Sequence, residues 1–231
     1  MMDIAANLNM VREQMRCAAE TAGRKPESIR LIAVSKTKPV SMIREAVDCG
    51  VRDFGENRPQ ELAQKFVEVP NVRWHLIGQL QRNKVKLIID KVFLIHSVDS
   101  LALAEEIEKR AAAIDKIQDV LIQVNISGES TKSGVSPEEA PDLCRKISLL
   151  PHIRILGLMT ISVKDFSEDE NRALFAKLQE LAKKIEQMEI PGVFMQELSM
   201  GMTHDYTAAI LAGATMVRVG SGIFGERNTK I

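Results

Sequence analysis

Short strand-like segments alternate with helix-like segments eight times along this 231-residue chain. Each strand-like segment has four to six residues, and most are rich in Val, Ile and Leu, as buried strands are. The predicted strands are residues 30–35, 51–55, 73–77, 92–95, 120–124, 153–158, 194–198 and 216–219. Alternating strands and helices predict a parallel sheet, and eight such units predict a closed α/β structure, the (β/α)8 TIM barrel. An open, doubly wound sheet is the alternative.

An additional helix precedes the first strand. Ile4, Leu8, Val11 and Met15 recur every three or four residues, which gives one apolar face. No linker rich in Pro, Gly or Ser interrupts the units that follow. We therefore expect residues 1–231 to form one barrel domain with an extra N-terminal helix.

Composition excludes several classes of function. The chain has 31 basic and 31 acidic residues, so no global charge favours nucleic acid or a membrane surface. It has no apolar run of membrane-spanning length and no export signal at its start. Three scattered cysteines suit a reducing cytoplasm, and four histidines without ligand spacing give no metal site. We expect a cytoplasmic, monomeric protein.

Lys36 follows the first apolar strand directly, in Leu-Ile-Ala-Val-Ser-Lys-Thr-Lys-Pro at 31–39. A lysine at the edge of an apolar core has a lowered pKa when it is desolvated, and it can then form a Schiff base with a carbonyl compound. The alternative is a solvated lysine just past a strand. These nine residues alone favour neither interpretation.

A glycine-rich segment follows the last predicted strand, at 220–225, and contains Gly-x-Gly-x-x-Gly. The dinucleotide fingerprint of this form needs a following helix and an acidic residue on the next strand, and only six residues follow Gly225. Loops after strands seven and eight of a barrel commonly bind phosphate through backbone N–H groups. The expected phosphate site combines both loops, and the alternative is a simple glycine-rich turn. Its residues are Ser199, Met200, Thr203, Gly220, Ser221 and Gly222.

Closure of a barrel makes strand eight the neighbour of strand one, which brings this phosphate site next to Lys36. A phosphate ester that carries an aldehyde would bridge the two, and pyridoxal 5′-phosphate (PLP) fits that description. Arg218 is expected to point into the same space, where a cation facing the pyridine nitrogen would weaken the ring as an electron sink. A buried salt bridge of Arg218 with Glu56 or Glu197 is the alternative.

Several short segments, spread over nearly the whole chain, together match a known family. They are Ala-Val-Ser-Lys-Thr-Lys at 33–38, Phe-Gly-Glu-Asn-Arg at 54–58, Trp-His-Leu-Ile-Gly-Gln-Leu-Gln-Arg-Asn-Lys at 74–84, and shorter matches at 96–99, 157–159, 198–202, 217–220 and 223–225. In these segments the chain resembles the pyridoxal phosphate homeostasis proteins of the YggS/PROSC type. The resemblance implies a PLP barrel of fold type III, related to the N-terminal domain of alanine racemase. It also implies that Lys36 carries the Schiff base, that Arg218 faces the pyridine nitrogen and that Asn57 lies beside the cofactor. Ser199, Thr203, Gly220 and Ser221 fall on the family's phosphate-binding positions.

Members of this family hold PLP and keep the vitamin B6 pool in balance, so the resemblance implies a carrier that delivers PLP to apo-enzymes, with no catalytic residue. A PLP-dependent amino-acid racemase or another Schiff-base enzyme is the alternative, and a lysine aldolase acting on a sugar phosphate is a weaker one. In alanine racemases the second base is a tyrosine from a C-terminal domain, for which a chain ending at Ile231 has no room. The single tyrosine, Tyr206, is expected to be a packing residue.

Overall fold

The computed structural model describes residues 3–129, 133–163 and 166–226, and its eight strands close into a parallel barrel in the order β1 to β8. The strands are β1 Arg30–Val34, β2 Asp53–Glu56, β3 Arg73–Leu76, β4 Leu94–Val98, β5 Gln118–Gln123, β6 Ile153–Met159, β7 Val193–Ser199 and β8 Met216–Val219. The pairing of β1 with β8, from Arg30 beside Met216 to Ala33 beside Val219, closes the ring. The predicted (β/α)8 barrel is confirmed, and the open sheet is excluded.

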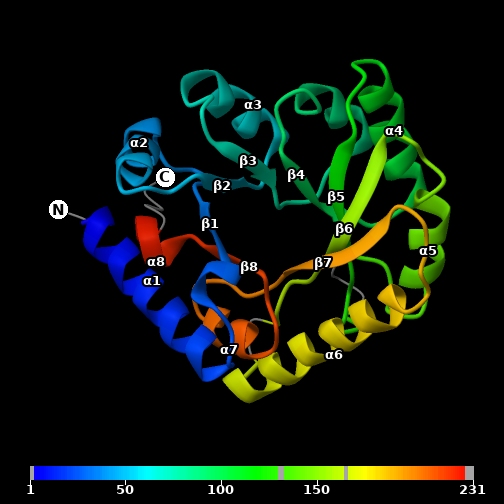
Figure 1. Cartoon of the computed structure of the whole chain (residues 1–231). Helices are drawn as coiled ribbons and strands as arrows, with labels where there is room; N and C mark the ends of the chain where they lie inside the picture. Colours follow the sequence, from blue (N-terminus) through cyan, green and yellow to red (C-terminus); the bar gives the residue numbers. More distant parts are fainter. Residues whose placement is uncertain (1–2, 130–132, 164–165, 227–231) are drawn as a thin grey trace.

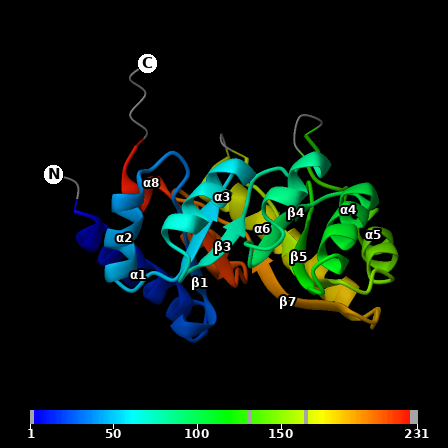
Figure 2. The same cartoon turned by 90° about the horizontal axis from the view of Figure 1, so that it is seen from above.

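Helices surround this ring (Figure 1). They are α1 Ile4–Thr21, η1 Pro26–Ser28, α2 Val40–Asp48, α3 Pro59–Glu68, η2 Arg82–Leu87, α4 Leu101–Ala112, α5 Ala140–Ile147, α6 Glu168–Glu186, α7 Tyr206–Leu211 and α8 Ser221–Phe224. The connection between β3 and β4 is a short 3-10 helix (η2) rather than a full α-helix. The additional helix α1 packs against α7, α8 and α2, beside the seam where β8 meets β1 (Figures 1 and 2).

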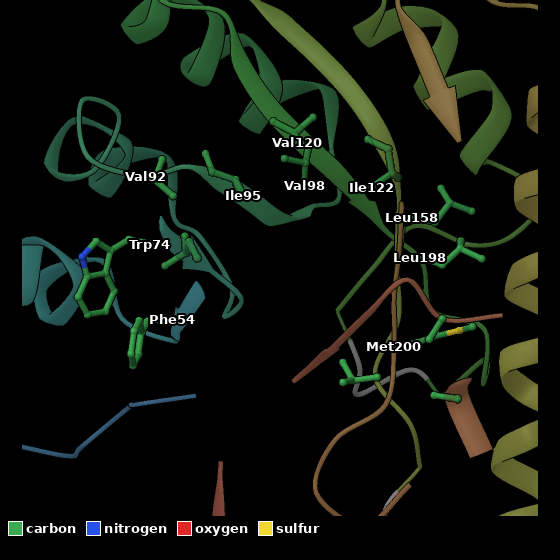
Figure 3. Packing of buried hydrophobic residues seen from close by; sticks show 14 of the residues in the cluster. Phe54, Trp74, Val92, Ile95, Val98, Val120, Ile122, Leu158, Leu198 and Met200 are labelled. Carbon is green, nitrogen blue, oxygen red and sulfur yellow. The ribbon is translucent and has the colours of Figure 1, made fainter. Parts of the chain in front are cut away.

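The apolar core has two parts. Most of it lies between the strands and the surrounding helices, where Phe54 and Trp74 contact one another with ring centroids 5.7 Å apart (Figure 3). A smaller cluster fills the barrel itself with side chains from alternate strand positions. Its members are Ile32, Leu94, Leu121, Met159 and Met216. The barrel is therefore a packed core, and only its rim can hold a ligand.

Candidate functional site: a cavity between a lysine and an arginine

A cavity of about 620 Å³ opens at the carboxyl ends of the strands, where the site of a barrel is expected. It brings together six of the nine predicted site residues: Lys36, Asn57, Thr203, Arg218, Gly220 and Ser221. Its other lining residues were not predicted. These are Val34, Lys38, Ile77, Ile161, Met202, His204, Gly225 and Glu226.

The cavity has an apolar wall that follows from strand periodicity. Val34 and Ile77 lie at or just after the ends of β1 and β3, and Ile161 lies two residues past the end of β6. Apart from Met200, the predicted list held only polar residues and glycines, so it overlooked these three apolar residues. A flat aromatic ligand needs such a wall, because most ligand cavities combine apolar side chains with a few polar anchors. A larger groove of about 750 Å³ between η2 and α4 contains none of the predicted residues.

The backbone just before Lys36 is fixed by buried groups. The Ser35 hydroxyl donates to Glu56 Oε1 at 2.7 Å, and Lys65 Nζ donates to both Glu56 Oε1 and the Ser35 carbonyl oxygen at 2.8 Å. Burial raises the pKa of Glu56, although Lys65 and Ser35 act in the opposite direction. These contacts tie the end of β1 to β2 and α3, and so set where Lys36 stands.

The residues just after Lys36 are fixed as well. Thr37 has a φ of 63°, in the left-handed region that is uncommon for a residue other than glycine. Its N–H donates to Glu61 Oε1 at 2.6 Å, and Lys65 holds the same oxygen at 2.7 Å. Lys38 Nζ donates to the carbonyl oxygens of residues 224, 225 and 226 at 2.8 to 3.0 Å. Lys38 therefore ties this loop to the end of α8, and both Lys36 and Lys38 line the cavity.

Arg218 is 4% exposed and reaches the cavity from β8. Its Nη1 donates to Ser199 Oγ at 2.6 Å and its Nη2 donates to the Thr160 carbonyl oxygen at 2.8 Å. Burial lowers the pKa of Arg218 to about 10, with the charge of Asp205 opposing the shift, so the guanidinium is protonated at neutral pH.

The alternative partners considered for Arg218 are engaged elsewhere. Glu56 accepts from Ser35 and Lys65, as described above. Glu197 lies 3.4 Å from Arg30 and accepts from the Thr215 hydroxyl at 2.6 Å. The structure thus gives Arg218 neutral oxygen partners in place of the salt bridge with either glutamate.

The loops after β7 and β8 meet at Thr203. Its hydroxyl accepts from the N–H groups of Gly220 and Gly222 at 3.3 and 3.4 Å. A Cβ at Gly220 would lie 3.4 Å from Val34, which is ordinary contact, whereas a Cβ at Gly222 would lie 3.0 Å from Val219. The Gly220 N–H and the Thr203 hydroxyl thus lie at one edge of the cavity, and groups of these kinds are what an anion site requires.

Three predicted site residues do not line the cavity. Gly222 belongs to α8, and its N–H donates to the Thr203 hydroxyl oxygen. Met200 is fully buried in the outer core, and its N–H donates to the Met216 carbonyl oxygen. Ser199 is also fully buried, and its hydroxyl oxygen accepts from Arg218.

Tyr206 packs between two helices. It is 4% exposed, and its hydroxyl donates to the Gln14 side chain in α1. Burial raises its pKa.

Among the described residues, no cluster of His, Cys, Asp or Glu could hold a metal ion. No helix in the same part of the chain is long and apolar enough to cross a bilayer.

The fold agrees with comparisons to known proteins. The family model described as "Alanine racemase, N-terminal domain" matches residues 6–228. A protein of Aquifex aeolicus named "Pyridoxal phosphate homeostasis protein" is 44% identical, covering 98% of this chain and 99% of that protein. The chain therefore belongs to the pyridoxal phosphate homeostasis proteins, a branch of the alanine racemase N-terminal domain family.

Two solved structures have the same fold as this chain. The structure of PipY of Synechococcus elongatus was solved with PLP bound. PipY is 37% identical to this chain, and the two structures match with a TM-score of 0.85 over 96% of this chain and 100% of PipY. An alanine racemase of Clostridium difficile is 17% identical with a TM-score of 0.77, covering 98% of this chain and 57% of that one. The second likeness concerns the fold alone.

Proposed function

We propose that this protein binds PLP in the cavity between Lys36 and Arg218. The observation that carries the proposal is the convergence of a lysine, a buried guanidinium and the loops after β7 and β8 on one cavity of about 620 Å³. The volume lies within the range of about 300–1,000 Å³ that is usual for cofactor sites. PLP supplies an aldehyde, an electron-poor ring and a dianionic phosphate, and each has a counterpart here.

The chain's residues have distinct tasks in this proposal. Lys36 supplies the amine for a Schiff base with the aldehyde. Arg218 faces the pyridine nitrogen, and Asn57 and Ile77 border the ring. Gly220, Ser221 and Thr203 hold the phosphate through N–H and O–H groups, whose bonds to an anion are stronger than neutral hydrogen bonds.

The role we propose is to store PLP and deliver it to apo-enzymes, a role compatible with the word homeostasis in the name of the Aquifex relative. The position proposed for Arg218 favours a PLP carrier over a PLP-dependent enzyme. A protonated guanidinium opposite the pyridine nitrogen disfavours protonation of that nitrogen and so weakens the electron sink that carbanion chemistry needs. We further propose that the carrier is a monomer and that residues 1–231 act as one domain.

The visible spectrum of the purified protein on addition of PLP tests the proposal. We expect a yellow band that borohydride abolishes, and loss of this band in Lys36→Ala with some non-covalent binding retained. The exposed Lys86→Ala is the matched control and should keep the band. A lysine aldolase would bind sugar phosphates and give no such band. Incubation of the loaded protein with an apo-enzyme should then restore that enzyme's activity, and failure to do so would contradict the delivery role.

The alternative is a PLP-dependent racemase, which needs an acid or base on each face of the substrate. Lys36 could serve one face. Tyr206 contacts Gln14 between two helices and does not line the cavity. We expect negligible solvent deuterium incorporation at the α-carbon of alanine and other amino acids. Rapid exchange with formation of both enantiomers, lost in Lys36→Ala, would make the enzyme the better account.

A further inference from the structure

A line of buried polar side chains crosses the barrel interior from Arg218 to Asp53. Arg218 Nη1 lies 2.6 Å from Ser199 Oγ, which lies 2.9 Å from His96 Nδ1. His96 Nε2 lies 3.0 Å from His75 Nδ1, and His75 Nε2 lies 2.9 Å from Asp53 Oδ1. All five residues are at most 5% exposed, and they come from β8, β7, β4, β3 and β2.

With both imidazoles neutral, the chemistry of the end groups sets the direction of every hydrogen bond. The Asp53 carboxylate only accepts, and its other oxygen accepts from Arg73 at 2.5 Å, so His75 Nε2 carries a hydrogen. A neutral His75 then accepts at Nδ1 from His96 Nε2–H. His96 in turn accepts at Nδ1 from the Ser199 hydroxyl, which leaves the Ser199 oxygen to accept from Arg218.

This direction requires both imidazoles to be neutral. Burial lowers the pKa of His75, and the charges of Arg30 and Arg73 lower it further, whereas Asp53 acts to raise it. Burial lowers the pKa of His96 well below 6.5, and His75, Arg218 and Arg30 add to the shift. Burial alone would raise the pKa of Asp53, but His75 and Arg73 outweigh it and the pKa is lowered. The charged groups that face the line therefore keep a carboxylate at one end and neutral rings between.

We propose that Asp53, His75, His96 and Ser199 form a relay that positions Arg218 in the cofactor cavity. The Ser199 hydroxyl and the Thr160 carbonyl oxygen each accept a hydrogen bond from one guanidinium nitrogen of Arg218. The orientation of the guanidinium is therefore fixed, and its remaining N–H groups present one arrangement to a ligand. The histidines act by orienting the Ser199 hydroxyl. Without His96 as its acceptor, that hydroxyl could turn its hydrogen toward Arg218 and break the contact.

The first test uses the ligand-free protein and does not depend on PLP binding. Long-range 1H–15N NMR of the four histidines should show His75 and His96 as neutral Nε2–H tautomers at pH 7. His152→Gln and His204→Gln, which lie outside the relay, assign the two other signals. An imidazolium or an Nδ1–H tautomer at His75 or His96 would overturn the relay.

Ser199→Ala removes the link between histidine and arginine, and Ser97→Ala is its matched control. Ser97 is 1% exposed on β4, and its hydroxyl has no partner among the described residues. We expect the His96 Nδ1 resonance to move in Ser199→Ala and to stay in Ser97→Ala. Unchanged His96 resonances in Ser199→Ala would contradict the proposed contact.

The second test rests on the proposed function and asks whether the relay acts on the cofactor. Ser199→Ala should shift the visible band of the PLP-loaded protein and weaken PLP retention roughly tenfold, because the guanidinium loses a group that orients it toward the ligand. Ser199→Thr, which keeps a hydroxyl, should restore the band position. A Ser199→Ala spectrum and affinity equal to wild type would overturn the positioning role. Failure of the wild type to bind PLP would instead refute the proposed function and leave the NMR test in force.

Discussion

Lys36 and Arg218 both line the cavity, and the protein holds each by a different means. Lys36 stands between Ser35, which is fixed by Glu56 and Lys65, and Thr37, which is fixed by Glu61. Arg218 is buried and held by neutral oxygen atoms. A loop with fixed neighbours keeps the lysine in place, while the barrel interior keeps the arginine in place.

The cavity residues differ in how far the sequence could predict them. Lys36, Thr203, Arg218 and Gly220 follow from strand ends and from the closure of a barrel. The task of Ser199 does not follow, because its partner His96 is 103 positions away in the chain and meets it only across the barrel interior. From the sequence, Ser199 is predicted to bind the phosphate group. In the structure its hydroxyl oxygen accepts a hydrogen bond from Arg218.

Gly220→Leu tests the phosphate loops. A Cβ fits against Val34 at 3.4 Å, so the barrel should fold, but the longer side chain would occupy the place proposed for phosphate. We expect PLP affinity to fall at least about tenfold, because charge-assisted hydrogen bonds are lost. Equilibrium binding of PLP and of pyridoxal, which lacks the phosphate, measures this effect.

Pyridoxal provides the control for the same variant. Wild type should bind pyridoxal much more weakly than PLP, and Gly220→Leu should narrow the difference between the two ligands. If wild type binds both equally well, the phosphate site lies elsewhere.

Among the elements, α1 stabilises the seam of the barrel. Asn7 donates to the Ile223 carbonyl oxygen at 3.0 Å, and Gln14 accepts from Tyr206. Arg12 donates to the Cys49 carbonyl oxygen at the end of α2. The additional helix thus supports α7 and α8, the elements that carry the loops after β7 and β8.

Leu8→Ala tests the contribution of α1. Leu8 is fully buried, so its truncation should lower the free energy of unfolding by about 2–5 kcal/mol. Met10 is 60% exposed on the same helix, and Met10→Ala should change the value by no more than about 0.5 kcal/mol. Urea denaturation measures both. Equal effects would show that α1 is not part of the core.

The sequence predicts which segments form strands better than where the strands end. The fourth strand is predicted at 92–95, but β4 is Leu94–Val98. The apolar run misleads here, because Val92 is buried in the connection that precedes the strand. His96 and Ser97 extend the strand although they are polar. His96 can be buried because His75 and Ser199 satisfy both of its ring nitrogens.

At the scale of the whole molecule, the buried histidines make stability depend on pH. The pKa of His75 and of His96 is lowered from 6.5, so the unfolded chain binds protons below about pH 6.5 that the folded barrel does not. The free energy of unfolding therefore falls as the pH falls through this range, by up to about 1.4 kcal/mol per pH unit for each histidine. Burial also raises the pKa of Glu56 above 4.5 and that of Asp99 above 3.8, and these two carboxyl groups act in the opposite sense at lower pH.

Urea denaturation between pH 7 and pH 5 measures this slope. We expect the free energy of unfolding to fall on acidification through this range, by no more than about 1.4 kcal/mol per pH unit for each histidine. His204 is exposed, so His204→Gln should leave the slope unchanged. A stability that is constant or rises on acidification would contradict neutral, buried histidines.

The most direct measurement is to identify the lysine that carries PLP. The loaded protein is reduced with borohydride, digested and mapped by mass spectrometry. We predict a single pyridoxyl label on Lys36, absent in Lys36→Ala and present in Lys86→Ala. A label on Lys38 or Lys84, or no label at all on the loaded protein, would contradict the assignment of the cavity between Lys36 and Arg218 as the PLP site.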